Sequence, residues 1–178
     1  FEYGRNFCNK FWNAARFAIM NLEGYTPAPV TADQLRMEDR WILSRLARVA
    51  AEMDQFLGRY QFDAATRTVR EFVWHEFCDW YLEMIKPALS AEALTGDRLR
   101  QRAVLLRVYE TILALSHPFM PFLTEELWHA LPGDRGLLYD RPFPVADAAV
   151  TDENVEEDMA HLMEVIRAVR NIRSELNV

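Results

Sequence analysis

The segment Phe72-Val73-Trp74-His75-Glu76-Phe77-Cys78-Asp79-Trp80-Tyr81-Leu82-Glu83-Met84-Ile85 decides the predicted fold. Its apolar and aromatic side chains recur at helical spacing, and the pattern extends back to Val69. They cover more than half of the circumference of a helix, which is typical of a helix surrounded by others. We therefore predict a central helix that has Asp63 as its N-cap and ends near Lys86, before Pro87.

Helical periodicity extends through most of the remaining sequence, which has 178 residues in all. Glycine and proline separate the helical segments, as expected of interhelical loops. Further helices are predicted at residues 1–22, 38–58, 97–116 and 152–178, with a short helix at 124–131. The sequence therefore predicts an all-α bundle of about five main helices plus a short helix.

The predicted core contains one face of the first helix and several aromatic residues of later segments. The apolar side chains of the first helix share one side at about 100° per residue. These residues are Phe7, Phe11, Ala14, Ala15, Ala18 and Leu22. The aromatic residues interpreted most simply as core are Trp41, Trp80, Tyr81, Phe119 and Phe122.

The charge balance is acidic, with 20 Lys and Arg against 27 Asp and Glu and a formal net charge of -7. Nucleic-acid binding usually goes with a basic surface, so the average charge argues against it. However, nearly all of the cations are arginines, which suit both phosphate contacts and structural ion pairs. The placement of the arginines must therefore decide between these roles.

Composition and motifs exclude several classes of protein. The apolar runs are too short for a membrane span, and two distant cysteines cannot form a disulfide framework, so a cytoplasmic location is expected. Neither a phosphate-binding glycine loop nor a nucleophile elbow is present, so no catalytic residue is expected. His75 and Cys78 lie one turn apart but lack a second pair of ligands, so no metal site is predicted.

The first helix carries a polar face opposite its apolar one. Arg5, Asn9, Asn13 and Arg16 lie together on this face at helical spacing, with Lys10 at its edge. Acidic residues are absent between Arg5 and residue 20. Arginine and lysine bind phosphate, and asparagine and arginine can bind base edges, so the face is a candidate RNA contact. The alternative is an ordinary solvated helix surface.

The last predicted helix carries a second cationic stripe. Arg167 and Arg170 are candidates for RNA contact, whereas Arg173 rotates toward the apolar side. Arginines near a helix C-terminus also compensate the helix dipole, and this structural role is an equally good interpretation.

Residues 5–17, with the sequence RNFCNKFWNAARF, resemble the helix that follows the catalytic domain in valyl-tRNA synthetases. Isoleucine-specific relatives instead have an Arg-Asn-Thr-x-Arg-Phe pattern there. Four further blocks resemble the same family in the same order, so the resemblance covers essentially the whole chain. These blocks are residues 39–43 (DRWIL), 77–83 (FCDWYLE), 117–125 (HPFMPFLTE) and 170–175 (RNIRSE).

The resemblance implies an anticodon-binding helical domain over residues 1–178, in which residues 151–178 lead to a C-terminal region outside this sequence. It implies a parent valine–tRNA ligase that uses ATP with Mg²⁺ in a catalytic domain, whose ATP signatures this chain lacks. No cofactor is expected in the chain itself. The expected partners are the anticodon arm of tRNA(Val) and the catalytic, editing and C-terminal domains of the parent chain.

Three alternatives stay open at this point. The chain could belong to a ligase for another branched amino acid, although residues 9–14 argue against it. It could be a helical protein-interaction module without an RNA role. The polar face of the first helix could also dock against the catalytic domain, because the sequence, which starts with Phe1, is expected to be part of a longer chain.

Overall fold

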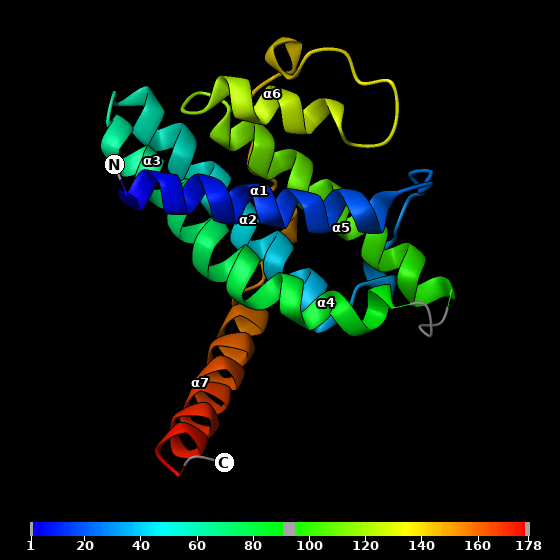
Figure 1. The fold of residues 1–178 in the computed structure, drawn as a ribbon, viewed down its shortest axis with the longest axis vertical. Coiled ribbons are helices and arrows are strands. Elements are labelled where there is room, and N and C mark those ends of the chain that lie inside the picture. Colours follow the sequence, from blue (N-terminus) through cyan, green and yellow to red (C-terminus); the bar gives the residue numbers. More distant parts are fainter. Residues whose placement is uncertain (1, 91–94, 177–178) are drawn as a thin grey trace.

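The computed structural model describes residues 2–90 and 95–176, apart from the side chain of Tyr3. Residues 1, 177 and 178, which belong to the first and last predicted helices, lie outside the described residues. The described part contains helices and no strand, which confirms the all-α prediction (Figure 1). Its helices are α1 (Glu2–Leu22), α2 (Met37–Gly58), α3 (Phe62–Glu71), η2 (Phe72–Tyr81), α4 (Leu82–Leu89), α5 (Thr95–Ser116), α6 (Pro121–His129) and α7 (Glu153–Glu175). Three short 3₁₀ turns lie in the described loops: η1 (Ala32–Gln34), η3 (Leu138–Asp140) and η4 (Ala148–Val150).

The central helix consists of α3, η2 and α4, which follow one another without a break. Its middle part, η2, is a π-helix, and the backbone N–H of Leu82 donates to the carbonyl oxygen of Phe77, five residues earlier. In an α-helix, residues five apart point about 140° away from each other. In η2 they share a face instead, and Phe72, Phe77 and Leu82 are all buried. This wider turn departs from the α-helical spacing predicted for residues 63–86.

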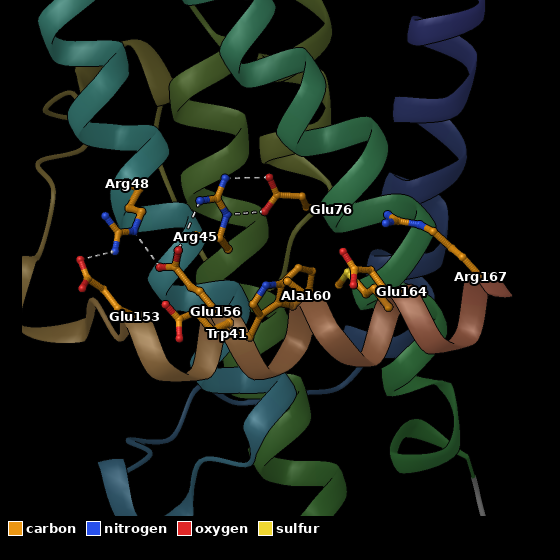
Figure 2. Close-up of a pocket in the computed structure, with 11 residues that line it drawn as sticks. Trp41, Arg45, Arg48, Glu76, Glu153, Glu156, Ala160, Glu164 and Arg167 are labelled. Atoms are coloured by element: carbon orange, nitrogen blue, oxygen red, sulfur yellow. Dashed lines mark hydrogen bonds and ion pairs between the residues drawn. The ribbon is translucent and has the colours of Figure 1, made fainter.

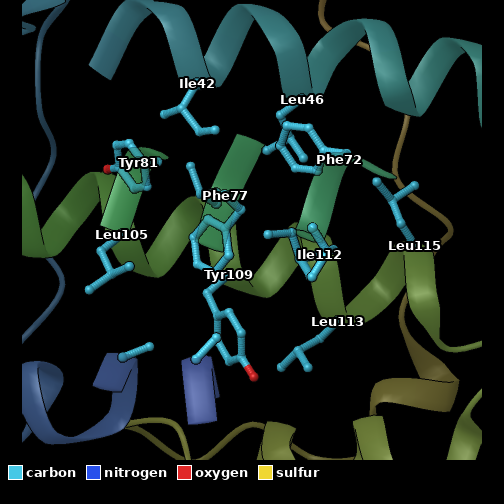
Figure 3. Packing of buried hydrophobic residues seen from close by; sticks show 14 of the residues in the cluster. Ile42, Leu46, Phe72, Phe77, Tyr81, Leu105, Tyr109, Ile112, Leu113 and Leu115 are labelled. Atoms are coloured by element: carbon cyan, nitrogen blue, oxygen red, sulfur yellow. The ribbon is translucent and has the colours of Figure 1, made fainter. Parts of the chain in front are cut away.

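The core lies where η2, α5 and α1 meet (Figure 3). The ring of Tyr109 from α5 stacks on Phe77 at a centroid distance of 6.0 Å and contacts Phe11 of α1 at 6.3 Å. Aromatic pairs of this kind add about 0.5–1.5 kcal/mol each beyond the area that they bury. All six apolar residues predicted for the first helix are buried, which confirms that face of α1.

A buried polar network joins α2, α5 and η2. The carboxylate of Asp39 is fully buried and accepts hydrogen bonds from the backbone N–H of Arg36 (3.1 Å), Arg100 Nε (2.9 Å) and Gln101 Nε2 (3.0 Å). Gln101 Nε2 also donates to the hydroxyl of Tyr81 at 2.8 Å. A buried carboxylate is stable only when it is paired and hydrogen-bonded, so this network fixes the register of the three helices.

Both predicted ends of the central helix are wrong. The N-cap is Gln61, whose carbonyl oxygen accepts from the N–H of Ala65 at 3.0 Å, and this places Asp63 inside the first turn. At the other end the helix continues through Pro87 to Leu89. A proline removes one backbone hydrogen bond, but contacts of Leu89 with the core hold the last turn in helical geometry.

Three aromatic residues predicted as core are not buried. Phe122 is 91% exposed, because α6 begins at Pro121, three residues earlier than predicted. Proline suits the first turn of a helix, and the earlier start places Phe122 on the outer side of that turn. Trp80 and Phe119 are only half-buried, and both pack against the core from its edge. Trp41 and Tyr81 are buried as expected.

We expect Asp39→Ala to lower the free energy of unfolding by about 2 kcal/mol or more, because it removes the buried carboxylate from Gln101 and from Arg100, which keeps only Asp97. Urea denaturation followed by circular dichroism measures the change. The control is Asp63→Ala, whose ion pair with Arg67 is exposed and should contribute less than about 1 kcal/mol. Equal losses for the two variants would contradict the role of the buried network.

Candidate nucleic-acid interface

α1 presents its predicted polar face to solvent. The side chains of Arg5, Asn9, Asn13 and Arg16 are all exposed, while the opposite side of the helix is buried. Arg5 lies 3.6 Å from Glu2, an ion pair between two exposed side chains that costs little to break. Solvated guanidinium and amide groups can bind phosphates and base edges. The structure therefore brings these four predicted residues together on one accessible face.

Lys10 differs from the other predicted residues of α1 because it is half-buried and already paired. Its ammonium donates to the carboxylate of Asp79 and lies 4.3 Å from the ring centre of Trp74. Asp79 Oδ2 also lies 3.3 Å from Nδ1 of His75. Trp74 and Asp79 are five residues apart, so the π-helical turn places both against one ammonium. An RNA phosphate would have to compete with Asp79 for Lys10.

A hollow of about 210 Å³ lies beside Lys10, between α1 and the segment where η2 meets α4. Phe17 and Asn13 of α1 line one side, and Glu83 and Lys86 line the other. Lys86 Nζ donates to Glu83 at 2.6 Å, so the carboxylate is held in place. An aromatic ring, an amide and a carboxylate are groups that stack on and hydrogen-bond an unpaired base.

Asp79, Glu83 and Lys86 were not predicted as site residues. They occur in a segment that was interpreted as the core of the bundle. Their spacing of three and four residues along an otherwise apolar helix is a signal that could have identified them as one polar stripe.

The predicted arginines of α7 contact the same π-helix. Arg167 and Arg170 are exposed, and the guanidinium carbon of each lies 5.4 Å from the ring centre of Trp80. A cation over an aromatic face is attracted by the ring quadrupole. Trp80 directly follows Asp79, so the two predicted cationic stripes reach neighbouring residues of η2.

Ion pairs attach the first turns of α7 to α2, and α2 to η2, around a cavity of about 570 Å³ (Figure 2). Glu156 accepts hydrogen bonds from Ser44 and from Arg48 Nε (2.8 Å), and it lies 3.4 Å from Arg45 Nη1. Arg45 also donates to Glu76 of η2 at 2.7 and 2.9 Å. Most of the arginine charge in this cavity is therefore bound to carboxylates of the same chain.

The carboxylates at the start of α7 have lowered pKa values. Burial raises the pKa of Glu156, but hydrogen bonds from Ser44 and Arg48 and the charge of Arg45 outweigh burial and lower it. Asp152 is the N-cap of α7, and the hydrogen bond from the Val155 N–H, with one from Arg40, lowers the pKa of its carboxyl group. The attachment of α7 therefore depends on ionised carboxylates.

The histidine and cysteine noted in the sequence do not form a reactive site. Burial raises the pKa of the Cys78 thiol to about 12, so it stays protonated near neutral pH, and a protonated thiol is a poor nucleophile and metal ligand. Residues 2–90 and 95–176 contain no cluster of three or more His, Cys, Asp and Glu that could hold a metal ion. Over the same residues, none of the helices has the length and apolar character needed to cross a membrane.

Comparison with known families gives a match to the anticodon-binding domain of tRNA ligase, over residues 39–178. The chain belongs to this family. The match starts at Asp39, near the beginning of α2, and covers the helices that form the rest of the bundle. The polar face of α1 precedes the matched part of the anticodon-binding domain.

Curated relatives extend the similarity to α1. The anticodon-binding domain is 46% identical over 174 residues to the valine–tRNA ligase of Carboxydothermus hydrogenoformans. The aligned part is 98% of this chain and 20% of that protein. It is 42% identical over 178 residues to the valine–tRNA ligase of Thermotoga maritima. This alignment covers 100% of this chain and 20% of the relative. The chain therefore spans about a fifth of the length of these relatives.

A solved structure shares the fold of the anticodon-binding domain. It is the LeuRS of Agrobacterium radiobacter K84 agnB2, in a ternary complex with tRNA and LeuAMS. The TM-score is 0.61 at 18% identity, over 84% of this chain and 17% of that chain. This likeness supports the fold: the helical bundle expected for a class I synthetase is confirmed.

We expect acid to detach α7. Groups with lowered pKa values stabilise the folded state above their unfolded pKa, about 4 for Asp and Glu, and this stability is lost as pH falls through the lower folded values. Amide hydrogen exchange of α7 should therefore accelerate relative to α5 when pH falls from 7 to about 3, after correction for the intrinsic rate.

Glu156→Gln should loosen α7 already at pH 7 and weaken its pH dependence. Glu164→Gln is the matched control, because Glu164 lines the same cavity. Equal effects of both substitutions would contradict the assignment of Glu156 as the main attachment point.

Proposed function

We propose that this chain is the anticodon-binding domain of a valine–tRNA ligase and binds the anticodon arm of tRNA(Val). The observation that carries the proposal is the exposed face of Arg5, Asn9, Asn13 and Arg16 beside the hollow at Phe17. Family membership supports the anticodon arm as the target, and the 40–46% identity to valine–tRNA ligases supports the valine-specific tRNA.

The geometry suits a single-stranded loop that approaches α1 from outside the bundle. Arg5 and Arg16 stand about 16 Å apart along the helix axis, with the two asparagines between them. The arginines would bind backbone phosphates, and Asn9 and Asn13 would hydrogen-bond exposed base edges. An unpaired base would enter the hollow and stack on Phe17, with Glu83 accepting from its exocyclic amino group.

Arg167 and Arg170 supply a second contact in this proposal. Both remain exposed although each lies over Trp80, so their outer N–H groups can still donate to phosphate. Lys10 contributes mainly through the positive charge beside the hollow, because Asp79 holds its ammonium. The site residues proposed for tRNA are thus Arg5, Asn9, Lys10, Asn13, Arg16, Arg167 and Arg170.

The role of the domain in a complete ligase would be positioning rather than bond chemistry. A rigid bundle that holds the anticodon arm fixes the distance to the reactive end of the tRNA, and this raises the rate by orienting the reactants. ATP with Mg²⁺, valine activation and editing would belong to the catalytic and editing domains. The described residues of this chain offer no cluster of ligands for the metal.

We expect Arg5→Ala combined with Arg16→Ala to weaken binding of tRNA(Val) at least about tenfold and to reduce the salt slope of log K by about 1–2, since two phosphate contacts are lost. Band shifts at several salt concentrations measure both quantities. The matched control is Arg59→Ala with Arg107→Ala, which removes two exposed arginines outside α1, one at the C-cap of α2 and one in α5, and should leave binding unchanged.

The same double substitution in a complete valine–tRNA ligase separates RNA contact from domain docking. The proposal predicts a raised KM for tRNA and an unchanged rate of valyl-adenylate formation. A loss of adenylate formation would contradict it and assign the polar face of α1 to the catalytic domain.

We expect Phe17→Leu to weaken binding of the tRNA(Val) anticodon arm about fivefold to tenfold without changing the salt slope, because stacking contributes about 1–3 kcal/mol per base and is not ionic. Phe56→Leu is the matched control, since Phe56 is also half-buried but lies on α2. A change in the salt slope, or an equal effect of both substitutions, would exclude base stacking at the hollow.

A further inference from the structure

Both lysines of the chain line the hollow between α1 and the segment where η2 meets α4. Lys10 belongs to α1 and Lys86 to α4, and the remaining cations counted in the net charge are arginines. An ammonium is a compact point charge, whereas the planar guanidinium of arginine matches the oxygens of a phosphate. The cations of the hollow therefore differ in kind from the arginines on the exposed face of α1.

Each lysine of the hollow is paired with a carboxylate of the central helix. Lys10 Nζ donates to Asp79, and Lys86 Nζ donates to Glu83 at 2.6 Å. These two pairs add no net charge to the hollow, whereas the exposed arginines make the adjoining face of α1 positive. A hollow without net charge beside a cationic face suits an uncharged base whose phosphates lie outside.

Contacts on both oxygens hold the Asp79 carboxylate. Oδ1 accepts a hydrogen bond from Lys10, and Oδ2 lies 3.3 Å from Nδ1 of His75, within hydrogen-bond distance. The Lys10 ammonium also lies 4.3 Å from the ring centre of Trp74, which limits its movement. The lining of the hollow includes Lys10 but not Asp79, so Asp79 acts on a bound base only through Lys10.

Pairing with Asp79 still leaves Lys10 able to donate into the hollow. An ammonium group has three N–H donors, and the side chain of Lys10 is 27% exposed. Glu83 on the other side of the hollow supplies an acceptor. A donor and an acceptor on opposite walls match the hydrogen-bonding edge of a base. A phosphate, in contrast, would have to replace Asp79 as the partner of Lys10.

We propose that Asp79 is a positioning residue for tRNA selectivity, an inference that rests on the proposed function. Its carboxylate keeps the Lys10 ammonium at the wall of the hollow, where it donates to an acceptor atom of the bound base. The same pairing keeps Lys10 away from phosphates, which every tRNA presents whatever its sequence. Lys10 then contributes to discrimination between anticodon loops, while the exposed arginines of α1 supply the phosphate contacts.

The test compares two anticodon stem-loops in band shifts at several salt concentrations. One has the tRNA(Val) sequence and the other has uridine at every anticodon position, so both carry the same phosphates but different bases. Asp79→Asn should bind the uridine loop at least about threefold more tightly than the unchanged chain does and steepen the salt slope by about 0.7, because Lys10 gains a phosphate contact. Discrimination between the two loops should fall at least about threefold, because Lys10 no longer faces the base.

Further variants separate the position of Lys10 from its charge. Lys10→Met added to Asp79→Asn should return the salt slope to that of the unchanged chain, and Asp79→Glu, which keeps a carboxylate, should preserve both slope and discrimination. Lys10→Met alone should weaken binding of the native loop at least about threefold more than that of the uridine loop, and this result does not depend on the folding of the Asp79 variants. Circular dichroism verifies that each variant is folded.

The matched control is Glu52→Gln, which removes one exposed carboxylate from α2, away from the hollow, and should change neither the salt slope nor the discrimination. Equal effects of Asp79→Asn and Glu52→Gln would overturn the proposal and assign the change to net charge. Weaker binding of both loops by Asp79→Asn, with discrimination unchanged, would overturn it in favour of a purely structural role.

The response of Lys10→Met gives an independent decision. Equal weakening of both loops would overturn the proposal and assign Lys10 to phosphate contact. Failure of the proposed function is seen in the unchanged chain instead. If that chain binds the two loops equally, base contact at the hollow is wrong, and the inference about Asp79 is overturned with it.

Discussion

The π-helix η2 is the element on which the other helices depend. Its wide turn directs nearby residues toward four different helices. Trp74 and Asp79 contact Lys10 of α1, and Glu76 pairs with Arg45 of α2. Trp80 contacts the arginines of α7, and Tyr81 is hydrogen-bonded to Gln101 of α5. In an α-helix of the same sequence each residue would be rotated by a further ~15–20°, and these contacts would not coincide. One local departure from α-helical geometry therefore sets both the core and the candidate tRNA site.

The acidic net charge of -7 is compatible with a local RNA contact because the arginines fall into two groups, those paired within the bundle and those exposed on α1. Arg45, Arg48 and Arg100 are bound to carboxylates that attach helices to each other, so they are not available to RNA. Arg5 and Arg16 lie on a stretch of α1 without acids between them, where positive charge faces solvent. A local contact with phosphate is compatible with an acidic average because salt screens charges beyond about 10 Å.

Helical periodicity was sufficient to predict the bundle, the buried side of α1 and the N-cap region of α7, because these features follow from local spacing and capping. Features that depend on tertiary contacts were not predictable in this way. The π-helical turn, and with it the pairing of Lys10 with Asp79, requires a spacing that an α-helical pattern does not contain. Phe122 was misplaced for a similar reason, since hydrophobicity alone does not show which aromatic residues stay exposed in the folded chain.

In the function proposed here, η2 holds α1 so that its polar face and the adjoining hollow receive the anticodon loop. The most direct measurement is an NMR titration of the chain with the tRNA(Val) anticodon stem-loop at low salt. We expect the largest chemical-shift changes on Arg5–Phe17 of α1 and on residues 79–86, with small changes at residues 58–62 and 117–123. Shifts confined to residues 58–62 and 117–123, with α1 unaffected, would contradict it.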